Sequence, residues 1–184
     1  MSGFQSSSPL PYVPALQLDF GVDPLLLKAV IFGTDIGLKM TGVKLTTIGT
    51  SRIPTVRHSI TAMVGLVGRH SGNVTLNLSE AATLHLAGAL MSGTFTEIDE
   101  DCVDAVMELA NMVAGGIKAT LSGTEHAVEN ISLPSIVIGH SHAVGYARGI
   151  VAVSVEFELP GMPFSTTSAR FFSTTLSLLR TAGG

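Results

Sequence analysis

Residues 101–121 read DCVDAVMELANMVAGGIKATL, and this stretch carries most of the information on fold and function. At about 100° of rotation per residue, its apolar and polar residues fall on opposite faces of an α-helix. The predicted apolar face consists of Val103, Val106, Met107, Ala110, Val113, Ala114, Ile117 and Leu121. The opposite stripe consists of Asp101, Asp104, Glu108, Asn111, Gly115 and Lys118. The helix is therefore expected to pack its apolar face on a core and to leave this stripe in solvent.

Two polar residues of the stripe, Glu108 and Asn111, are three positions apart and share one surface. Gly115 follows four residues later and keeps the adjoining surface low enough for another backbone to approach. On spacing alone such a pair is also ordinary on a solvated helix. Two glycines inside a helix cost about 1–2 kcal/mol relative to alanines, so close packing or the approach of a partner is expected at Gly115, Gly116 or both.

The run ELANMVAGGIK at residues 108–118, followed by ISLPSIVIG at residues 131–139, resembles the CheX members of the CheC/CheX/FliY family. These proteins are phosphatases that act on the phosphorylated chemotaxis response regulator CheY. The resemblance extends more weakly over residues 23–179, through an upstream hairpin, a second Ala-rich helix and the closing strands. It implies a phosphatase that stimulates hydrolysis of the phosphoaspartate of a CheY-like receiver domain, in chemotaxis or related two-component signalling.

The resemblance also implies roles for the residues of the stripe. Asn111 would orient the attacking water, since its amide both donates and accepts and carries no charge to repel phosphoryl oxygens. Glu108 would pair with the active-site lysine of the regulator. No cofactor is expected on this chain, because the Mg²⁺ belongs to the partner's phosphorylation site. Asp104, Gly115 and Lys118 are expected to contact the partner, although Asp104 and Lys118 also suit the helix dipole at its two ends.

The preceding Ala-rich helix invites a comparison with the related CheC proteins, which are expected to carry a Glu-x-x-Asn pair on each of two helices. Here the matching place reads Glu80-Ala-Ala-Thr83, and threonine lacks the amide. The chain is therefore expected to have one site, as CheX has.

Two other functions remain open from the sequence. The first is a non-catalytic module of the same fold, which would bind a receiver domain or a sensory partner without hydrolysis; Glu108 and Asn111 argue against it. The second is a relative of the flagellar switch, which is disfavoured because the chain ends soon after Leu179, without room for the additional C-terminal domain expected there.

Composition bounds the class of protein. The 184 residues are 46% hydrophobic, which predicts one domain at residues 21–184 after an extended Pro/Ser arm at residues 1–20. A net charge of −4, with ten scattered Lys and Arg residues, argues against a nucleic-acid groove. No segment is long enough to span a bilayer and no basic leader precedes an apolar run, so a cytoplasmic protein is expected. The single cysteine, Cys102, is interpreted as a packing residue.

The remaining elements follow from caps, glycines and alternation. Asp23 is expected to cap a helix that starts at Pro24 and is weakened by Gly33 and Gly37, and Ser79 to cap the Ala-rich helix. Strands are predicted at residues 43–48, in a hairpin at 58–78 with its turn at 68–72, and at 131–138, 149–159 and 171–179. Three helices and about six strands in clusters predict an α+β domain with helices on one face of a mostly antiparallel sheet.

The strand at residues 149–157 is long, apolar and free of Lys and Arg, and we expect it to be the outermost strand of the sheet. CheX-like proteins form dimers by joining sheets. A homodimer paired along this strand is therefore predicted, with one receiver bound per subunit.

Three other motifs are weaker. His140-Ser141-His142 places two imidazoles on one face of an extended segment, but no third metal ligand is evident. Residues 139–143 resemble a nucleophile elbow without its final glycine. Residues 68–72 lack the Gly-Lys-Ser/Thr of a phosphate loop and are better explained as a hairpin turn.

Overall fold

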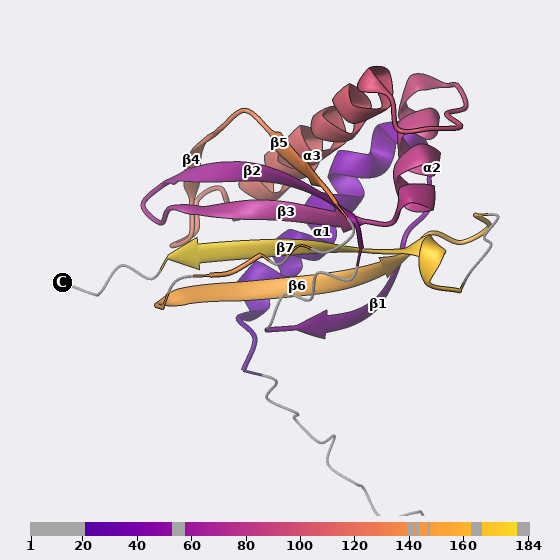
Figure 1. The fold of residues 1–184 in the computed structure, drawn as a ribbon. Helices are drawn as coiled ribbons and strands as arrows, with labels where there is room; N and C mark the ends of the chain where they lie inside the picture. The colour runs from indigo at the N-terminus through magenta and orange to yellow at the C-terminus, as the bar shows by residue number, and fades with distance from the viewer. Residues whose placement is uncertain are drawn as a thin grey trace, which may run out of the picture.

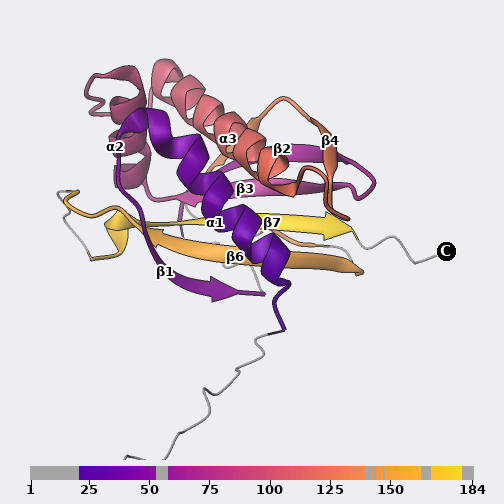
Figure 2. The ribbon, with the colours of Figure 1, turned by 180° about the vertical axis from the view of Figure 1, so that it is seen from behind.

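In the computed structural model, which describes residues 21–52, 58–139, 142, 144–146, 148–162 and 167–179, one sheet of seven strands carries three α-helices on one face (Figure 1; Figure 2). All strand pairs are antiparallel. This confirms the predicted fold class. The N-terminal arm predicted at residues 1–20 lies outside the described residues.

Two of the three helices begin directly after the caps predicted for them, Asp23 and Ser79. The three helices are α1 (Pro24–Leu38), α2 (Glu80–Met91) and α3 (Glu100–Leu121), with short 3-10 helices at Lys39–Thr41 and Thr167–Arg170. Asp23 accepts from the backbone N–H of Leu25 and Leu26, and Ser79 accepts from that of Ala82. Each cap satisfies donors that the first helical turn leaves without partners.

The strands are β1 (Thr46–Ser51), β2 (Ile60–Gly68), β3 (Gly72–Leu78), β4 (Val128–Ile131), β5 (Ser135–Ile138), β6 (Ile150–Glu158) and β7 (Phe171–Leu179). The single strand predicted at residues 131–138 is wrong. The chain leaves the sheet at residues 132–134, which include Pro134, and returns as a second short strand. The first strand lies three residues later than the predicted range of 43–48.

The strand order is β1-β6-β7-β3-β2-β4, and β5 pairs with the other end of β2. The prediction that residues 149–157 form the outermost strand is therefore wrong, because β6 pairs with β1 on one side and β7 on the other. Its apolar character reflects burial inside the sheet. β1 takes the edge position instead, with all six of its residues exposed.

The core lies between the sheet and the helices. Alternate residues of the inner strands point toward the helices, and Phe157 and Phe172 stack as a cross-strand pair with ring centroids 5.3 Å apart. The other face of the same strands is buried but polar, and its side chains pair with one another: Thr175 donates to Ser154, and Ser177 to Asn73. Hydrogen bonding removes most of the cost of burying these groups.

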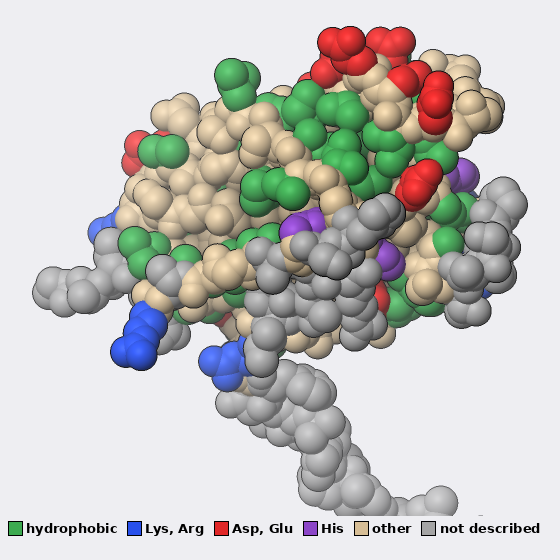
Figure 3. Space-filling view, viewed as in Figure 1, with side chains coloured by type: hydrophobic (Ala, Val, Ile, Leu, Met, Phe, Trp, Pro, Cys, Tyr) green, Lys and Arg blue, Asp and Glu red, His purple; other side chains and the backbone are tan. Residues whose placement is uncertain are grey.

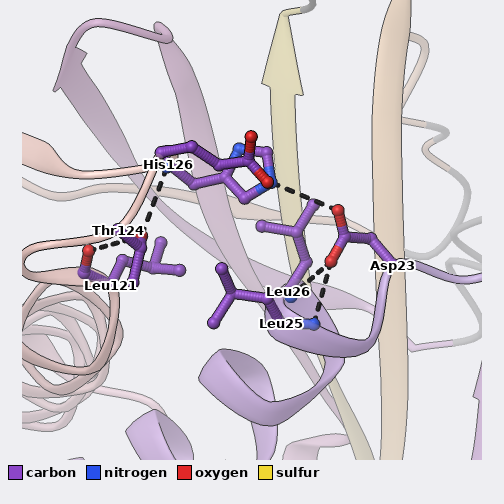
Figure 4. A network of polar contacts seen from close by, with 7 residues as sticks. Asp23, Leu25, Leu26, Leu121, Thr124 and His126 are labelled. Atoms are coloured by element: carbon purple, nitrogen blue, oxygen red, sulfur yellow. Dashed lines mark hydrogen bonds and ion pairs between the residues drawn. The ribbon is translucent and has the colours of Figure 1, made fainter.

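A second contact fixes the start of α1. Asp23 Oδ2 lies 3.2 Å from Nε2 of His126, in the loop between α3 and β4 (Figure 4). Burial raises the pKa of Asp23, but the hydrogen bonds from Leu26 and Leu25 and the contact with His126 outweigh burial, so the pKa lies below the usual aspartate value. One carboxylate therefore caps α1 and ties it to the end of α3.

Candidate functional site

The site predicted from the sequence lies on α3, and the structure fixes which of its faces is free. Asp99 caps the helix by accepting a hydrogen bond of 2.8 Å from the N–H of Cys102, and the inner residues of the helix are almost completely buried. Val103 and Met107, expected on the apolar face, are only half-buried, whereas Ala105 and Leu109 are buried. The buried arc is therefore rotated slightly from the one predicted.

The predicted stripe lies on the outer side of the helix. Glu108 and Asp104 are exposed, and Asn111, Gly115 and Lys118 are half-buried. A Cβ placed on Gly115 would meet no heavy atom within 4 Å, so the surface above it is open. The five residues form one continuous strip along the outer face of α3, and the open space above Gly115 leaves room for the backbone of another molecule.

The inner side of α3 contacts α1 through glycines. A Cβ on Gly37 would lie 2.5 Å from Cα of Val113, and one on Gly33 would lie 2.6 Å from the backbone nitrogen of Ile117. A Cβ on Gly116 would clash with the carbonyl oxygen of Gly33. The two helices therefore touch backbone to backbone, which larger side chains at these positions would prevent. Close packing therefore explains Gly116, one of the two causes expected from the sequence.

Acidic side chains gather around the N-terminal end of α3 (Figure 3). The exposed members of this group are Glu97, Asp99, Glu100, Asp101 and Asp104. Carboxylates there interact favourably with the helix dipole, and Lys118 does so in the last turn. The acidic residues make the N-terminal end of the outer face negative. This charge favours the approach of a cationic group toward Glu108.

The matching position on α2 is different. Thr83 is completely buried, and its Oγ1 has no hydrogen-bond partner among the described residues. Glu80, three residues earlier, is exposed in the first turn. Glu80 and Thr83 therefore do not form a pair on the surface, which gives a second reason to expect a single site.

The other motifs take structural roles where they are described. Cys102 is buried, and the pKa of its thiol is raised by burial and by Asp99, which confirms it as a packing residue. His142 Nε2 lies 2.7 Å from Oγ1 of Thr61, while residues 140 and 141 lie outside the described residues. Over the described ranges, no group of three or more His, Cys, Asp or Glu residues could hold a metal ion. No described helix is long and apolar enough to cross a membrane.

The family follows from comparison with known proteins. The family model described as "Chemotaxis phosphatase CheX" matches residues 60–158, more than half of the chain. The chain belongs to the CheX family. The matched residues include the whole of α2 and α3. The CheY-P phosphatase CheX of Thermotoga maritima is 28% identical over 107 residues, which cover 56% of this chain and 65% of that relative.

Solved structures share the fold at lower identity. A CheC-like superfamily protein from Shewanella sp. PV-4 superposes with a TM-score of 0.71 and 17% identity, covering 86% of this chain and 100% of that one. The CheX–CheY–BeF3–Mg²⁺ complex from Borrelia burgdorferi gives a TM-score of 0.68 and 17% identity, covering 84% and 98%. At these identities the structures support the fold.

Sequence reasoning missed the role of the glycines in α1. Gly33 and Gly37 were interpreted as weakening the helix, whereas they are the contact points with α3. The signal was present as two glycines four residues apart, the spacing that places both on one side of a helix.

Proposed function

We propose that this protein stimulates hydrolysis of the phosphoaspartate of a CheY-like receiver domain, in chemotaxis or related two-component signalling. The observation that carries the proposal is the position of Glu108 and Asn111 on the free face of α3, beside the open surface of Gly115, in a chain of the CheX family. The name of the Thermotoga maritima relative, a CheY-P phosphatase, supports the same substrate.

In this proposal Asn111 positions the attacking water. Its amide holds the water in line with phosphorus, water oxygen bonds to phosphorus, and the bond to the aspartyl oxygen breaks. The products are inorganic phosphate and the free aspartate carboxylate. Phosphoryl transfer from an acyl phosphate needs mainly positioning and charge neutralisation, so one amide on a rigid helix is sufficient on this side of the complex.

Glu108 anchors the receiver through the lysine of its phosphorylation site, one turn of α3 away from Asn111. The receiver supplies the Mg²⁺, and this chain supplies no cofactor; the Borrelia burgdorferi complex, which by its name contains CheY, BeF3 and Mg²⁺, supports this division. Gly115 admits the receiver backbone, and Asp104 and Lys118 make contacts at the rim, where exposed ion pairs contribute little. The proposal places the protein in the cytoplasm with its receiver.

A homodimer is part of the proposal, through a different strand from the one first expected. β1 has no Lys, Arg, Asp, Glu or Pro, and among the described residues only β6 pairs with it. Such an edge is suited to pairing with a second copy across a two-fold axis. Light scattering is expected to give twice the 19.1 kDa of one chain, and Ile48→Lys should return the mass to one chain. A single-chain mass for the parent at all concentrations would refute the dimer.

The decisive experiment follows decay of radiolabelled phosphoaspartate on a panel of CheY-like receiver domains. A substoichiometric amount of this protein should accelerate loss of label from at least one receiver over many turnovers. Binding with unchanged decay would instead establish the non-catalytic receiver-binding module. Neither binding nor acceleration on any receiver would reject both functions.

A further inference from the structure

The exposed side of α1 and of the 3-10 helix Lys39–Thr41 that follows it carries three large apolar side chains. Phe32, Ile36 and Met40 follow one another at intervals of four residues and are 52%, 51% and 78% exposed. We call this row the α1 ridge. Single exposed apolar residues are normal, but a row at helical spacing makes a continuous patch, and such patches mark interaction sites.

The orientation of α1 places the ridge on the outer surface of the helical layer. Gly33 and Gly37 contact α3, and the residues that directly follow them, Thr34 and Leu38, are buried. Thr34 donates toward Thr174 of β7, so this side of α1 faces the sheet. The first two ridge residues directly precede the two glycines and lie on the opposite side, away from the sheet. Figure 2 shows α1 lying across the sheet with α3 alongside it.

The same arrangement holds on α3. The residues of α3 that contact α1 include Val113 and Gly116, and the residue after each of them is buried. The residue before each, Met112 or Gly115, is half-buried at the surface. Residues that precede the contact points of two antiparallel helices lie on the same side of the helix pair. The ridge and the outer edge of the α3 stripe are therefore neighbouring rows of one surface.

The glycine contacts also set the level of each ridge residue. Gly37 lies opposite Val113, and Gly33 lies opposite Ile117. An earlier residue of α1 therefore meets a later residue of α3, so the two helices are antiparallel. Continuing from Gly37, Met40 lies at the level of residues 108–112. The C-terminal end of the ridge therefore lies at the level of Glu108, and Met112 lies between the two rows on the outer surface.

We propose that the α1 ridge is the apolar part of the receiver-docking surface, and that it packs on the receiver next to the phosphoaspartate while Glu108 and Asn111 reach into the phosphorylation site. This inference rests on the proposed function and adds residues outside α3 that determine affinity for the phosphorylated receiver.

The surface area that a stable interface needs supports the receiver domain as the partner that covers the ridge. A stable interface needs about 800 Å² from each partner, with an apolar centre and a polar rim. The α3 stripe is narrow, polar and partly glycine, so it cannot supply that area or an apolar centre. The ridge exposes roughly 300–400 Å² of apolar surface at the correct position. Both rows lie at the same level of two adjacent helices, so a domain docked on Glu108 can extend over the ridge.

The test separates binding from turnover. The double variant Ile36→Gln/Met40→Gln removes two ridge side chains with a good helix former and without a new charge. Leu133→Gln is the matched control, since Leu133 is 90% exposed on the turn between β4 and β5. The measurements are the Kd for a CheY-like receiver loaded with BeF3 and Mg²⁺, and the KM and kcat for the phosphorylated receiver, using a receiver that the parent dephosphorylates.

The ridge variant should raise Kd and KM at least tenfold and leave kcat within twofold, since truncating an interface anchor costs a factor of about ten. Leu133→Gln should change neither constant. Parent-like Kd and KM in the ridge variant would overturn the inference while the parent's turnover still supports the proposed function. If the parent instead binds a BeF3-loaded receiver but dephosphorylates none, and the ridge variant binds that receiver more weakly, the proposed function is rejected while the docking role of the ridge stands. A loss of self-association in the ridge variant, with receiver affinity unchanged, would reassign the ridge to a second copy of this chain.

Discussion

Neighbouring glycines of α3 meet opposite surroundings on its two faces. On the outer face a Cβ at Gly115 would meet no heavy atom within 4 Å, whereas on the inner face a Cβ at Gly116 would meet the backbone of Gly33. The inner glycine serves the fold, since it lets two helices touch, and the outer glycine leaves room for a partner. Two consecutive glycines therefore have different roles, one in the fold and one in the proposed function. Substitutions can test each role separately.

The largest effect is expected on the inner face. Gly116→Val should lower the free energy of unfolding by about 3 kcal/mol, because the new side chain meets backbone atoms that cannot move aside. Denaturant unfolding measures the loss. Gly115→Val is the matched control, with the same change in helix propensity in open space, and should cost less than about 1 kcal/mol. Equal losses would mean that the helices do not touch at Gly116.

The next effect belongs to the outer face. Asn111→Ala should reduce stimulated dephosphorylation about a hundredfold, equivalent to about 2.7 kcal/mol in the barrier, with little change in stability or receiver binding. Asn130→Ala on β4 is the control, since this asparagine is exposed and lies outside α3 and its stripe. Turnover like that of the parent in purified Asn111→Ala would remove the water-positioning role.

A third substitution asks whether the outer face of α3 has a counterpart on α2. Thr83→Asn restores the Glu-x-x-Asn spacing, but the amide would enter a buried space, so stability should fall by about 2 kcal/mol without any gain in turnover. Thr83→Val keeps the shape and removes a buried hydroxyl without a partner in the described structure, and should be neutral or stabilising. A rise in activity in Thr83→Asn would show that α2 presents this position to solvent.

A smaller effect concerns the contact that holds α1 beside the inner face. Because the pKa of Asp23 is lowered in the folded protein, its contribution is complete above the usual aspartate value near 3.8 and is lost as pH falls through the folded pKa. Asp23→Ala should cost about 1 kcal/mol at neutral pH. Asp23→Asn keeps the cap and should cost less. Unfolding free energies measured from pH 7 to pH 2 test this, and an unchanged acid slope in Asp23→Ala would contradict it.

The smallest predicted effect, that of Gly115→Ala, raises stability and lowers affinity for the receiver. Gly115→Ala should stabilise the protein by about 0.5–1 kcal/mol, because alanine is the better helix former and the space is open. The added methyl should nevertheless raise the KM for the phosphorylated receiver severalfold by keeping its backbone away. A gain in stability with an unchanged KM would show that the receiver does not approach Gly115.

Local signals in the sequence predicted the fold class and most elements. The caps at Asp23 and Ser79, the hairpin and the strand at Phe171–Leu179 were predictable because short-range chemistry determines them. The outward position of Glu108 and Asn111 followed from the strong amphipathic period of α3. These predictions needed no knowledge of the order of the strands.

The errors concern arrangements that depend on distant residues. The apolar pattern of residues 149–157 fits an edge strand and an inner strand equally well, and only the partners of β6 distinguish them. On α2 the alanines make both sides equally apolar, so the sequence did not show that Thr83 faces inward. The glycines of α1 weaken a helix considered alone, and their value appears only when α3 is placed against them.

The division of one predicted strand into β4 and β5 bears on how far the protein can assemble. Both pair with β2, but each is four residues long, and the chain leaves the sheet between them. This border offers an incoming strand no continuous row of backbone donors and acceptors, whereas β1 offers six residues. Short, interrupted edges resist pairing. A sheet with only one border open to pairing can join one other copy, so the proposed dimer through β1 would stop at two copies and would not grow into a fibre.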